Sequence, residues 1–248
     1  MKELLSLKKI KKPFLILLLV AIPLIALCII QYGKSFLHPK LNFEEIREFQ
    51  GVYFNLPKPM LVIDSAYLPE GLSPEALLVG NDELDANSIV EEVKSKKGEI
   101  NGKRVRLKGR IAYGDKKVII ELTEKENAFL YIENELTYPN RQTPPKPVTL
   151  KGKIIDPKCW FGTMVNNERE IHKTCATQSI NEGIPPILKV DYNGKDVYYI
   201  IDIGVEKTSQ TSLLAYVATP IQVKGQVYYQ NGWNVLQTSI NQISYLNE

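Results

Sequence analysis

The sequence predicts a mainly β protein in which an N-terminal transmembrane helix is followed by two tandem five-stranded barrels, each with one short helix. Three observations lead to this fold class. One strand-like phrase occurs three times, a helix pattern precedes a copy of it in each half of the chain, and an uncharged apolar run lies near the N-terminus. Of the 248 residues, 44% are hydrophobic and 24% are charged, as expected for a folded globular protein.

The repeated phrase is a β-strand pattern with a glycine at a fixed place. Its copies are VRLKGRI at residues 105–111, VTLKGKI at 148–154 and IQVKGQV at 221–227. Apolar and polar residues alternate in each copy, which is typical of a strand with one buried face. The glycine indicates a strand that bends strongly or closely approaches another backbone.

The first half of the outer region, residues 44–135, has the element order of an OB-like barrel. Strands are predicted at residues 51–54, 60–64, 76–79, 103–113 and 118–122. Between the third and fourth strands, Ser88 and Glu91 have the spacing of a capping box, and an apolar stripe of helical period follows. Three strands, a helix and two strands make the order of a five-stranded OB-type barrel.

The second half, residues 148–246, repeats this order. Strands are predicted at residues 148–155, 187–192, 196–203, 221–229 and 233–238, with a short helix near 210–217. Residues 136–147 separate the halves and contain four prolines, which cannot donate to a sheet ladder, so we expect a linker there. One continuous β-sandwich is the alternative, but it would not explain the helix before the fourth strand of each half.

The apolar run near the N-terminus predicts the membrane anchor and the compartment. Residues 14–30 form an uncharged apolar stretch that extends to residue 32, close to the roughly 20 residues that a membrane-spanning helix needs. Lysines crowd residues 1–13, so the positive-inside rule makes this segment a cytoplasmic basic stub. The rest of the chain is then expected on the periplasmic or outer side of a bacterial inner membrane. A cleaved signal peptide and a lipoprotein modified at Cys28 are the alternatives.

The formal net charge of +3 hides an uneven distribution. Residues 1–40 hold seven lysines and one acidic residue, whereas the remaining chain has a net charge of −3. A mildly acidic outer region lacks the positive surface with which proteins bind phosphate backbones, which argues against nucleic acid as a partner. The expected partners are the membrane, through residues 14–32, and a protein in the membrane or periplasm.

Residues 156–186 form a long insertion between the first two strands of the second barrel. Long loops in compact domains are usually functional, and this loop is one of the usual ligand-contacting loops of OB barrels. The insertion contains the side chains with thiol or metal chemistry, Cys159, Met164, His172 and Cys175. Residues 167–181 have helical character, and on such a helix His172, Cys175 and Ser179 share one face.

Three chemistries are open to this cluster. Cys159 and Cys175 are a candidate disulfide, because an even pair of cysteines outside the cytoplasm most often forms one. Cys159, His172 and Cys175, with Met164, are candidate metal ligands that suit Cu(I), or Zn if a harder group replaces the methionine. The third alternative is a redox-active thiol pair in which His172 lowers the pKa of the Cys175 thiol.

The same insertion resembles the signature of a family of uncharacterised bacterial membrane-anchored proteins. The shared motifs are Lys-Cys-x2-Gly-x-Met at residues 158–164, His-Lys-x-Cys-Ala at 172–176 and Gly-Ile-Pro-Pro at 183–186. The likeness extends upstream through Phe-Gln-Gly-Val at 49–52 and Lys-Pro-Met-Leu at 58–61, and so covers most of the outer region. That family has another cysteine where this chain has Ser179, which favours a simple cysteine pair here. The resemblance implies the topology and the place of the site but no reaction.

No catalytic or cofactor-binding motif accompanies the cluster. The sequence has no P-loop, no dinucleotide-binding glycine motif, no His-Glu-x-x-His and no nucleophile elbow. We therefore predict a membrane-anchored binding or assembly module without catalytic residues. A metal-handling or thiol-redox protein that uses Cys159, His172 and Cys175 is the alternative.

Overall fold

The computed structural model describes residues 22, 45–81, 85–135, 137–162, 173–204 and 211–246. The chain divides into two compact units, residues 1–38 and 39–248, and both barrels belong to the second. Apart from Ile22, the predicted transmembrane segment 14–32 lies outside the described residues. Within the described parts of the chain, no helix combines the length and the apolar character needed to cross a membrane.

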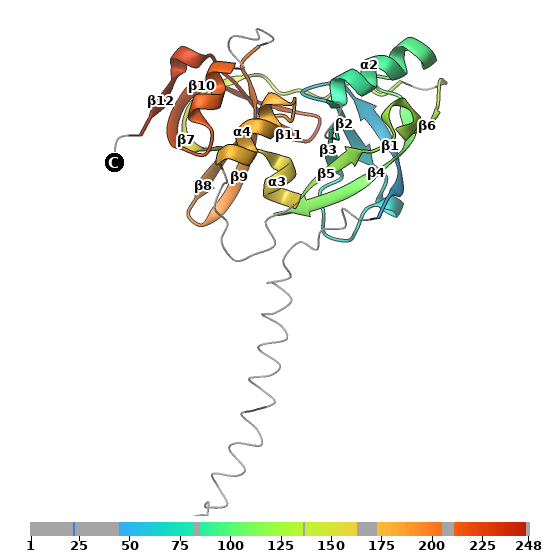
Figure 1. The fold of residues 1–248 in the computed structure, drawn as a ribbon, viewed down its shortest axis with the longest axis horizontal. Helices are drawn as coiled ribbons and strands as arrows, with labels where there is room; N and C mark the ends of the chain where they lie inside the picture. The colour runs from blue at the N-terminus through green and yellow to red at the C-terminus, as the bar shows by residue number, and fades with distance from the viewer. Residues whose placement is uncertain are drawn as a thin grey trace, which may run out of the picture. The chain divides into compact units, whose positions relative to one another are not determined.

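The first barrel is a closed sheet of five strands (Figure 1). Its strands are β1 (Arg47–Phe54), β2 (Met60–Ile63), β3 (Glu75–Val79), β4 (Arg104–Gly114) and β5 (Lys117–Leu122). The order around the barrel is β1-β2-β3-β5-β4, and β1 pairs with β4 to close it. Neighbouring strands are antiparallel, except that β3 and β5 are parallel. The short strand β6 (Phe129–Ile132) pairs with β4 in addition.

The second barrel repeats this topology strand by strand. Its strands are β7 (Lys146–Ile155), β8 (Ile187–Tyr192), β9 (Lys195–Asp202), β10 (Pro220–Gln230) and β11 (Trp233–Gln237), with β12 (Ile243–Tyr245) added to β10. The order is β7-β8-β9-β11-β10, closed by pairing of β10 with β7, and β9 and β11 are parallel. The prediction of two five-stranded barrels is confirmed, and the alternative of one β-sandwich is wrong.

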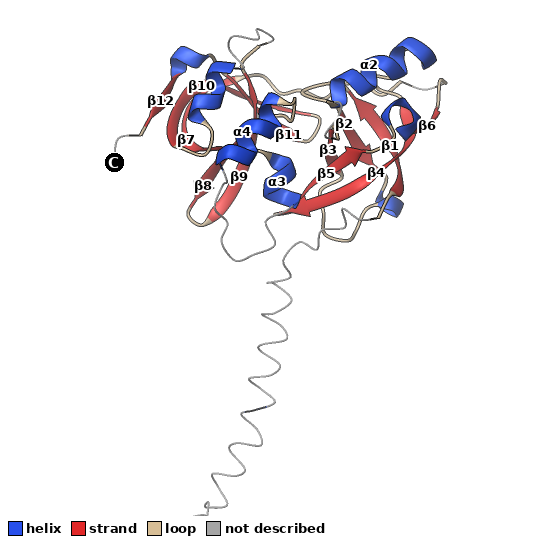
Figure 2. Ribbon diagram, viewed as in Figure 1, coloured by secondary structure: helices blue, strands red, loops and turns tan. Residues whose placement is uncertain are grey.

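Each barrel has a helical segment before its fourth strand, as Figure 2 shows for α2. In the first barrel this is α2 (Ala86–Lys97); in the second, a helical turn at residues 211–213 leads into the 3₁₀ helix η3 (Leu214–Tyr216). The insertion of the second barrel contributes α3 (Pro157–Gly162) and α4 (Lys173–Asn181). The other 3₁₀ helices are η1 (Ser65–Tyr67), η2 (Lys125–Ala128) and η4 (Ile240–Gln242).

The start of α2 corrects one sequence prediction. The N-cap is Asp85, three residues before Ser88, and its side chain accepts hydrogen bonds from the backbone N–H groups of Asn87 and Ser88. The Ser88 hydroxyl, which a capping box would aim at a backbone N–H further along the helix, donates to the Asp85 carboxylate at 2.5 Å. Asp is as good an N-cap as Ser, and the earlier cap lets Ala86, Ile89, Val90 and Val93 all reach the core.

The repeated glycine phrase marks strands that cross a neighbour at very short range. Gly109 of β4, Gly152 of β7 and Gly225 of β10 occupy the same place in its three copies. A Cβ atom added at these glycines would lie 2.6, 2.2 and 2.4 Å from a backbone carbonyl oxygen of the adjacent strand. Only glycine fits there, so the repeated phrase indicates strands that bend sharply to close a small barrel.

A third apolar cluster lies between the cores of the two barrels. The first barrel contributes Phe54, Met60, Leu77, Val79, Ala112 and Ile119, and the second contributes Ile155, Trp160, Phe161, Ile184, Ile187, Tyr198, Ile200 and Trp233. The buried side chains of β3 and β5 are thus divided between the barrel interior and this cluster. The two barrels share a buried core and do not pack as independent domains.

The predicted linker is held along its length by backbone hydrogen bonds. Tyr138 N–H donates to the carbonyl of Gly102 in the first barrel at 2.7 Å. Thr143 N–H donates to the carbonyl of Tyr229 in the second barrel at 2.9 Å. Strand β7 begins at Lys146, so the segment 137–145 is a tethered connection that spans the junction of the barrels.

Candidate functional site

The insertion between β7 and β8 begins with a buried carboxylate. Asp156 is 1% exposed, and its two oxygens accept backbone hydrogen bonds from Lys158 at 2.7 Å and Cys159 at 3.3 Å. The side chains of Cys159 and Ser179 also hydrogen-bond to it. Burial raises the pKa of the Asp156 carboxyl, and these hydrogen bonds offset only part of the rise. Asp156 therefore organises the start of α3 and joins it to α4.

The described part of the predicted cysteine cluster does not converge. Cys159 is half-buried in α3, Cys175 is exposed on α4, and no disulfide joins their sulfur atoms. The predicted bridge receives no support, because the Cys159 side chain is directed to Asp156 and Cys175 is open to solvent. Met164 and His172 lie outside the described residues. Among the residues that the structure does describe, no three His, Cys, Asp or Glu side chains could hold a metal ion.

The first helix of the insertion docks on the first barrel. Lys158 Nζ lies 2.7 Å from Oε1 of Glu121, a β5 residue that is only 5% exposed. Arg110 of β4 approaches the other carboxylate oxygen at 3.4 Å, so the buried acid is neutralised from both barrels. Phe161 is 1% exposed and packs against Gly114, where a Cβ atom would lie 3.0 Å from the phenyl ring.

A hydrogen-bond chain continues this contact. Trp160 Nε1 donates to the Tyr198 hydroxyl at 3.0 Å, and that hydroxyl donates to the carboxylate of Asp115 in the β4–β5 turn. Burial, together with the nearby Asp115 carboxylate, raises the pKa of Tyr198, so this hydroxyl stays protonated as a donor. The first part of the predicted ligand loop thus holds the two barrels together.

The β10–β11 hairpin makes a second junction through Asn231. Its amide nitrogen donates to the carbonyl of Leu56 at 2.8 Å and to the side-chain oxygen of Asn140 at 2.9 Å. Its amide oxygen accepts from the backbone N–H of Arg141 at 2.8 Å. One buried side chain therefore connects the first barrel, the connecting segment and the second barrel.

Trp233, the first residue of β11, completes this junction. It is fully buried, and its Nε1 donates to the backbone carbonyl of Glu75 in β3 at 3.0 Å. The ammonium group of Lys117 lies 4.3 Å from the centre of the indole ring. Burial lowers the pKa of Lys117, and the negative charge of Glu75 opposes that shift.

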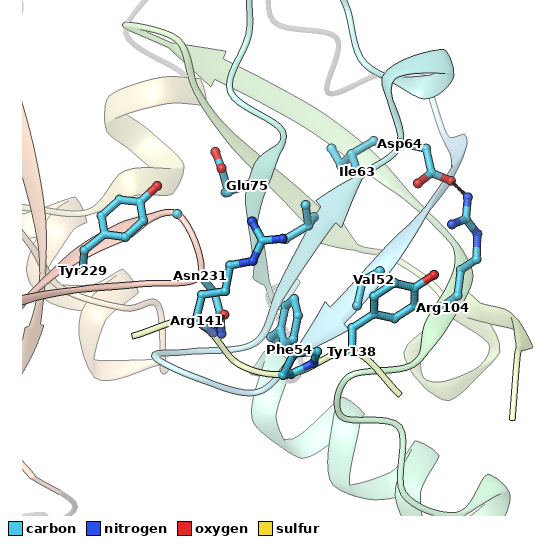
Figure 3. Close-up of a pocket in the computed structure, with 13 residues that line it drawn as sticks. Val52, Phe54, Ile63, Asp64, Glu75, Arg104, Tyr138, Arg141, Tyr229 and Asn231 are labelled. Atoms are coloured by element: carbon cyan, nitrogen blue, oxygen red, sulfur yellow. Dashed lines mark hydrogen bonds and ion pairs between the residues drawn. The ribbon is translucent and has the colours of Figure 1, made fainter. Parts of the chain in front are cut away.

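A cavity of about 370 Å³ lies between the barrels beside the β10–β11 junction. Its apolar floor consists of Val52, Phe54, Val62 and Ile63 from β1 and β2. Its rim consists of Asp64, Glu75, Arg104, Tyr138, Pro139, Arg141, Tyr229, Asn231 and Gly232 (Figure 3). The volume is within the range of small-molecule sites. The loop between the last two strands is one of the surfaces with which OB barrels bind ligands, and here that loop of the second barrel lines a cavity whose floor belongs to the first barrel.

The charged groups on the rim differ in how far they are neutralised. Asp64 and Arg104 form an ion pair at one end of the cavity (Figure 3). Burial raises the pKa of Tyr229; the negative charge of Glu75 adds to the rise and the positive charge of Arg141 opposes it, so both charges act at its hydroxyl. Among the described residues, no acidic side chain pairs with the guanidinium of Arg141.

No family model, curated protein or solved structure matches this chain. The resemblance to a membrane-anchored family stays a prediction, and the candidate site rests on its own geometry.

Sequence reasoning did not find the cavity. It assigned Tyr138 and Arg141 to a linker and Tyr229 to the end of the strand predicted at residues 221–229. The available signals were a tyrosine and an arginine within the proline-rich segment and the Asn231-Gly232 turn followed by tryptophan. None of these signals says that the hairpin reaches the other barrel, because its contacts with that barrel join residues separated by 175 and 158 positions.

Proposed function

We propose that the protein is a single-pass, membrane-anchored binding or assembly module whose barrels face the periplasm or the exterior. The binding site is the cavity between the barrels, framed by strands β1 and β2 of the first and the β10–β11 hairpin of the second. One observation carries this proposal: buried contacts fix the two barrels to each other and leave open an apolar cavity. Its rim carries two tyrosines and an arginine, Arg141, that forms no ion pair with any residue the structure describes.

Rigid framing favours binding, because a site held by its scaffold loses little conformational freedom when a ligand enters. The junctions at Asn231 and Trp233 lie at the edge of the cavity and hold the hairpin in place. Tyr138 and Tyr229 are 38% and 45% exposed, so their rings are accessible to a ligand. Aromatic side chains that are partly exposed beside an apolar floor are typical of binding surfaces.

The anchor is supported by the sequence alone, through the apolar run at residues 14–32 and the lysines before it. A reporter that is active only in the cytoplasm, fused to the C-terminus, is expected to be silent. The same reporter fused within residues 1–13 is expected to be active. Activity of the C-terminal fusion would contradict the orientation.

Occupancy of the cavity can be tested by photo-cross-linking in the cells that make the protein. A benzophenone amino acid at Tyr229 is expected to form an adduct that mass spectrometry of the digested protein detects. Tyr192, which is 47% exposed on β8 and outside the cavity, is the matched control. Equal labelling at both positions, or none at Tyr229, would overturn the cavity as the binding site.

The metal-handling or thiol-redox alternative has less support. The Cys159 side chain hydrogen-bonds to the Asp156 carboxyl group, whereas redox-active and metal-binding cysteines are thiolates held near positive charge. Measurement of copper, zinc and free thiols on one native sample distinguishes the two functions. Bound metal that is lost together in Cys159→Ser and Cys175→Ser variants would favour the alternative.

A further inference from the structure

Within the described parts of the chain, Arg141 is a cation that lines the cavity and forms no ion pair. The Arg141 guanidinium projects into the cavity between Tyr229 and Tyr138 (Figure 3). The backbone of Arg141 is fixed on both sides, because its N–H donates to Asn231 Oδ1 at 2.8 Å and its carbonyl accepts from Asn231 N–H at 2.9 Å. The guanidinium is therefore presented from an ordered position.

One of the two acids on the rim forms an ion pair with a neighbouring cation. Asp64 pairs with Arg104. Glu75 forms no ion pair among the described residues, and its negative charge raises the pKa of both Lys117 and Tyr229. The Arg141 guanidinium, which forms no ion pair among the described residues, is a positive group that can meet an anionic ligand, and it lies above an apolar floor that includes Val52 and Phe54.

We infer that the cavity binds a small amphiphilic carboxylate, such as the C-terminal residue of a peptide with an apolar side chain. The carboxylate pairs with Arg141 through two parallel N–H···O hydrogen bonds, the geometry that a planar guanidinium offers. The apolar group fills the space over Val52 and Phe54, and a cavity of about 370 Å³ admits one such residue. This inference rests on the proposed function and names the ligand class of the same site.

The test uses N-acetylphenylalanine as the probe and its neutral amide, N-acetylphenylalaninamide, as the chemical control. Both are titrated by NMR against the full chain in nanodiscs, with empty nanodiscs as the blank. The carboxylate is expected to bind at least about tenfold more tightly than the amide, because only the carboxylate pairs with a guanidinium.

Arg141→Gln is expected to remove this preference without a change in melting temperature, because its side chain makes no ion pair among the described residues. Arg47→Gln is the matched control, since Arg47 is exposed on β1, pairs only with Glu45 in the described structure and lies outside the cavity. It is expected to bind the probe like the unaltered chain.

Equal binding of the acid and the amide, or retained preference in Arg141→Gln, would overturn the carboxylate inference. If neither probe binds while cross-linking at Tyr229 still yields an adduct, the ligand class is wrong and the proposed function stands. If neither probe binds and Tyr229 yields no adduct, both fail.

Discussion

Asn231 shows how much of the interbarrel junction depends on a single side chain. It is 5% exposed, it satisfies three polar groups from two other segments, and it adopts a positive φ of 43°. Asparagine is one of the few residues with a side chain that tolerates this backbone conformation. The residue type therefore meets two requirements at once.

Asn231→Ala is expected to lower the free energy of unfolding by about 3 kcal/mol. The estimate combines the unsatisfied groups at Leu56, Asn140 and Arg141 with the cost of alanine at a positive φ. Urea unfolding followed by circular dichroism measures it. Asn231→Gly, which relieves only the backbone cost, is expected to recover about 1 kcal/mol of the loss. A loss under about 1 kcal/mol in the alanine variant would show that the junction is weak.

Asp156 gives the protein a pH dependence of known sign. Its pKa is raised in the folded state by burial, so between the unfolded value near 4 and the raised value the folded protein binds more protons. Stability contributed by this residue therefore rises as the pH falls through the folded pKa, and is lost as the pH rises.

The difference in unfolding free energy between the unaltered protein and Asp156→Asn is the direct measure of this effect. As the pH falls from neutral to 4, the unfolding free energy of the unaltered protein is expected to rise relative to that of Asp156→Asn, by up to about 1.4 kcal/mol per pH unit. Groups common to both proteins cancel in the difference. A difference that is constant, or that shifts in favour of Asp156→Asn on acidification, would contradict the assignment.

At the scale of elements, the sequence offers two candidate N-caps for α2, Asp85 and Ser88, and the structure shows that Asp85 is the cap. Desolvation raises the pKa of Asp85, but hydrogen bonds from Ser88 and Asn87 outweigh it, and the net shift is downward. The carboxylate is thus stabilised as an anion at the N-terminus of the helix.

Asp85→Ala is expected to cost about 1 kcal/mol of unfolding free energy, as for other N-cap losses. Ser88→Ala is expected to cost less, because the Ser88 backbone N–H keeps its bond to Asp85 at 3.1 Å. Thermal unfolding of the two variants gives the order. A capping box that began at Ser88 would give the reverse order.

Elements whose pattern is local were predicted well, and contacts between distant elements were not. The alternation around Gly109, Gly152 and Gly225 placed β4, β7 and β10 within two residues of their ends, because alternation and a required glycine are properties of one strand. No such pattern predicts the ion pair between Lys158 and Glu121 or the hydrogen bond from Trp233 to Glu75 of β3. Partners that are far apart in the sequence leave no periodic signal in either segment.

The absence of a sequence signal for distant contacts also explains why the cavity could not be predicted. The insertion at residues 156–186 is a candidate site from sequence alone, because cysteine and histidine have distinctive chemistry wherever they occur. The cavity is lined by valine, phenylalanine, tyrosine and arginine, which acquire a role only where the fold brings them together. Arg141 was predictable as a residue of the connecting segment but not as a cation over the floor of the first barrel.

At the scale of the whole molecule, the shared apolar cluster makes the two barrels one cooperative unit. Phe161 is the most informative member, because it belongs to α3, lies outside both barrel cores and is 1% exposed between Gly114 and Tyr198. Domains joined by a large buried apolar interface unfold together, whereas domains joined by a flexible linker unfold separately. The unaltered protein is therefore expected to show one heat-absorption peak for both barrels in calorimetry.

Phe161→Ala is expected to separate that peak into two. Removal of a buried phenylalanine costs roughly 3 to 5 kcal/mol, and here the loss falls on the coupling between the barrels and not on either closed sheet. Phe129→Ala, in the core of the first barrel, is the matched control, since it removes an equally buried ring from within one barrel. That variant is expected to lower the melting temperature while keeping a single peak, because the interface remains intact. Two peaks in the unaltered protein would mean that the barrels are independent, and the cavity between them would then lose the rigid frame on which binding depends.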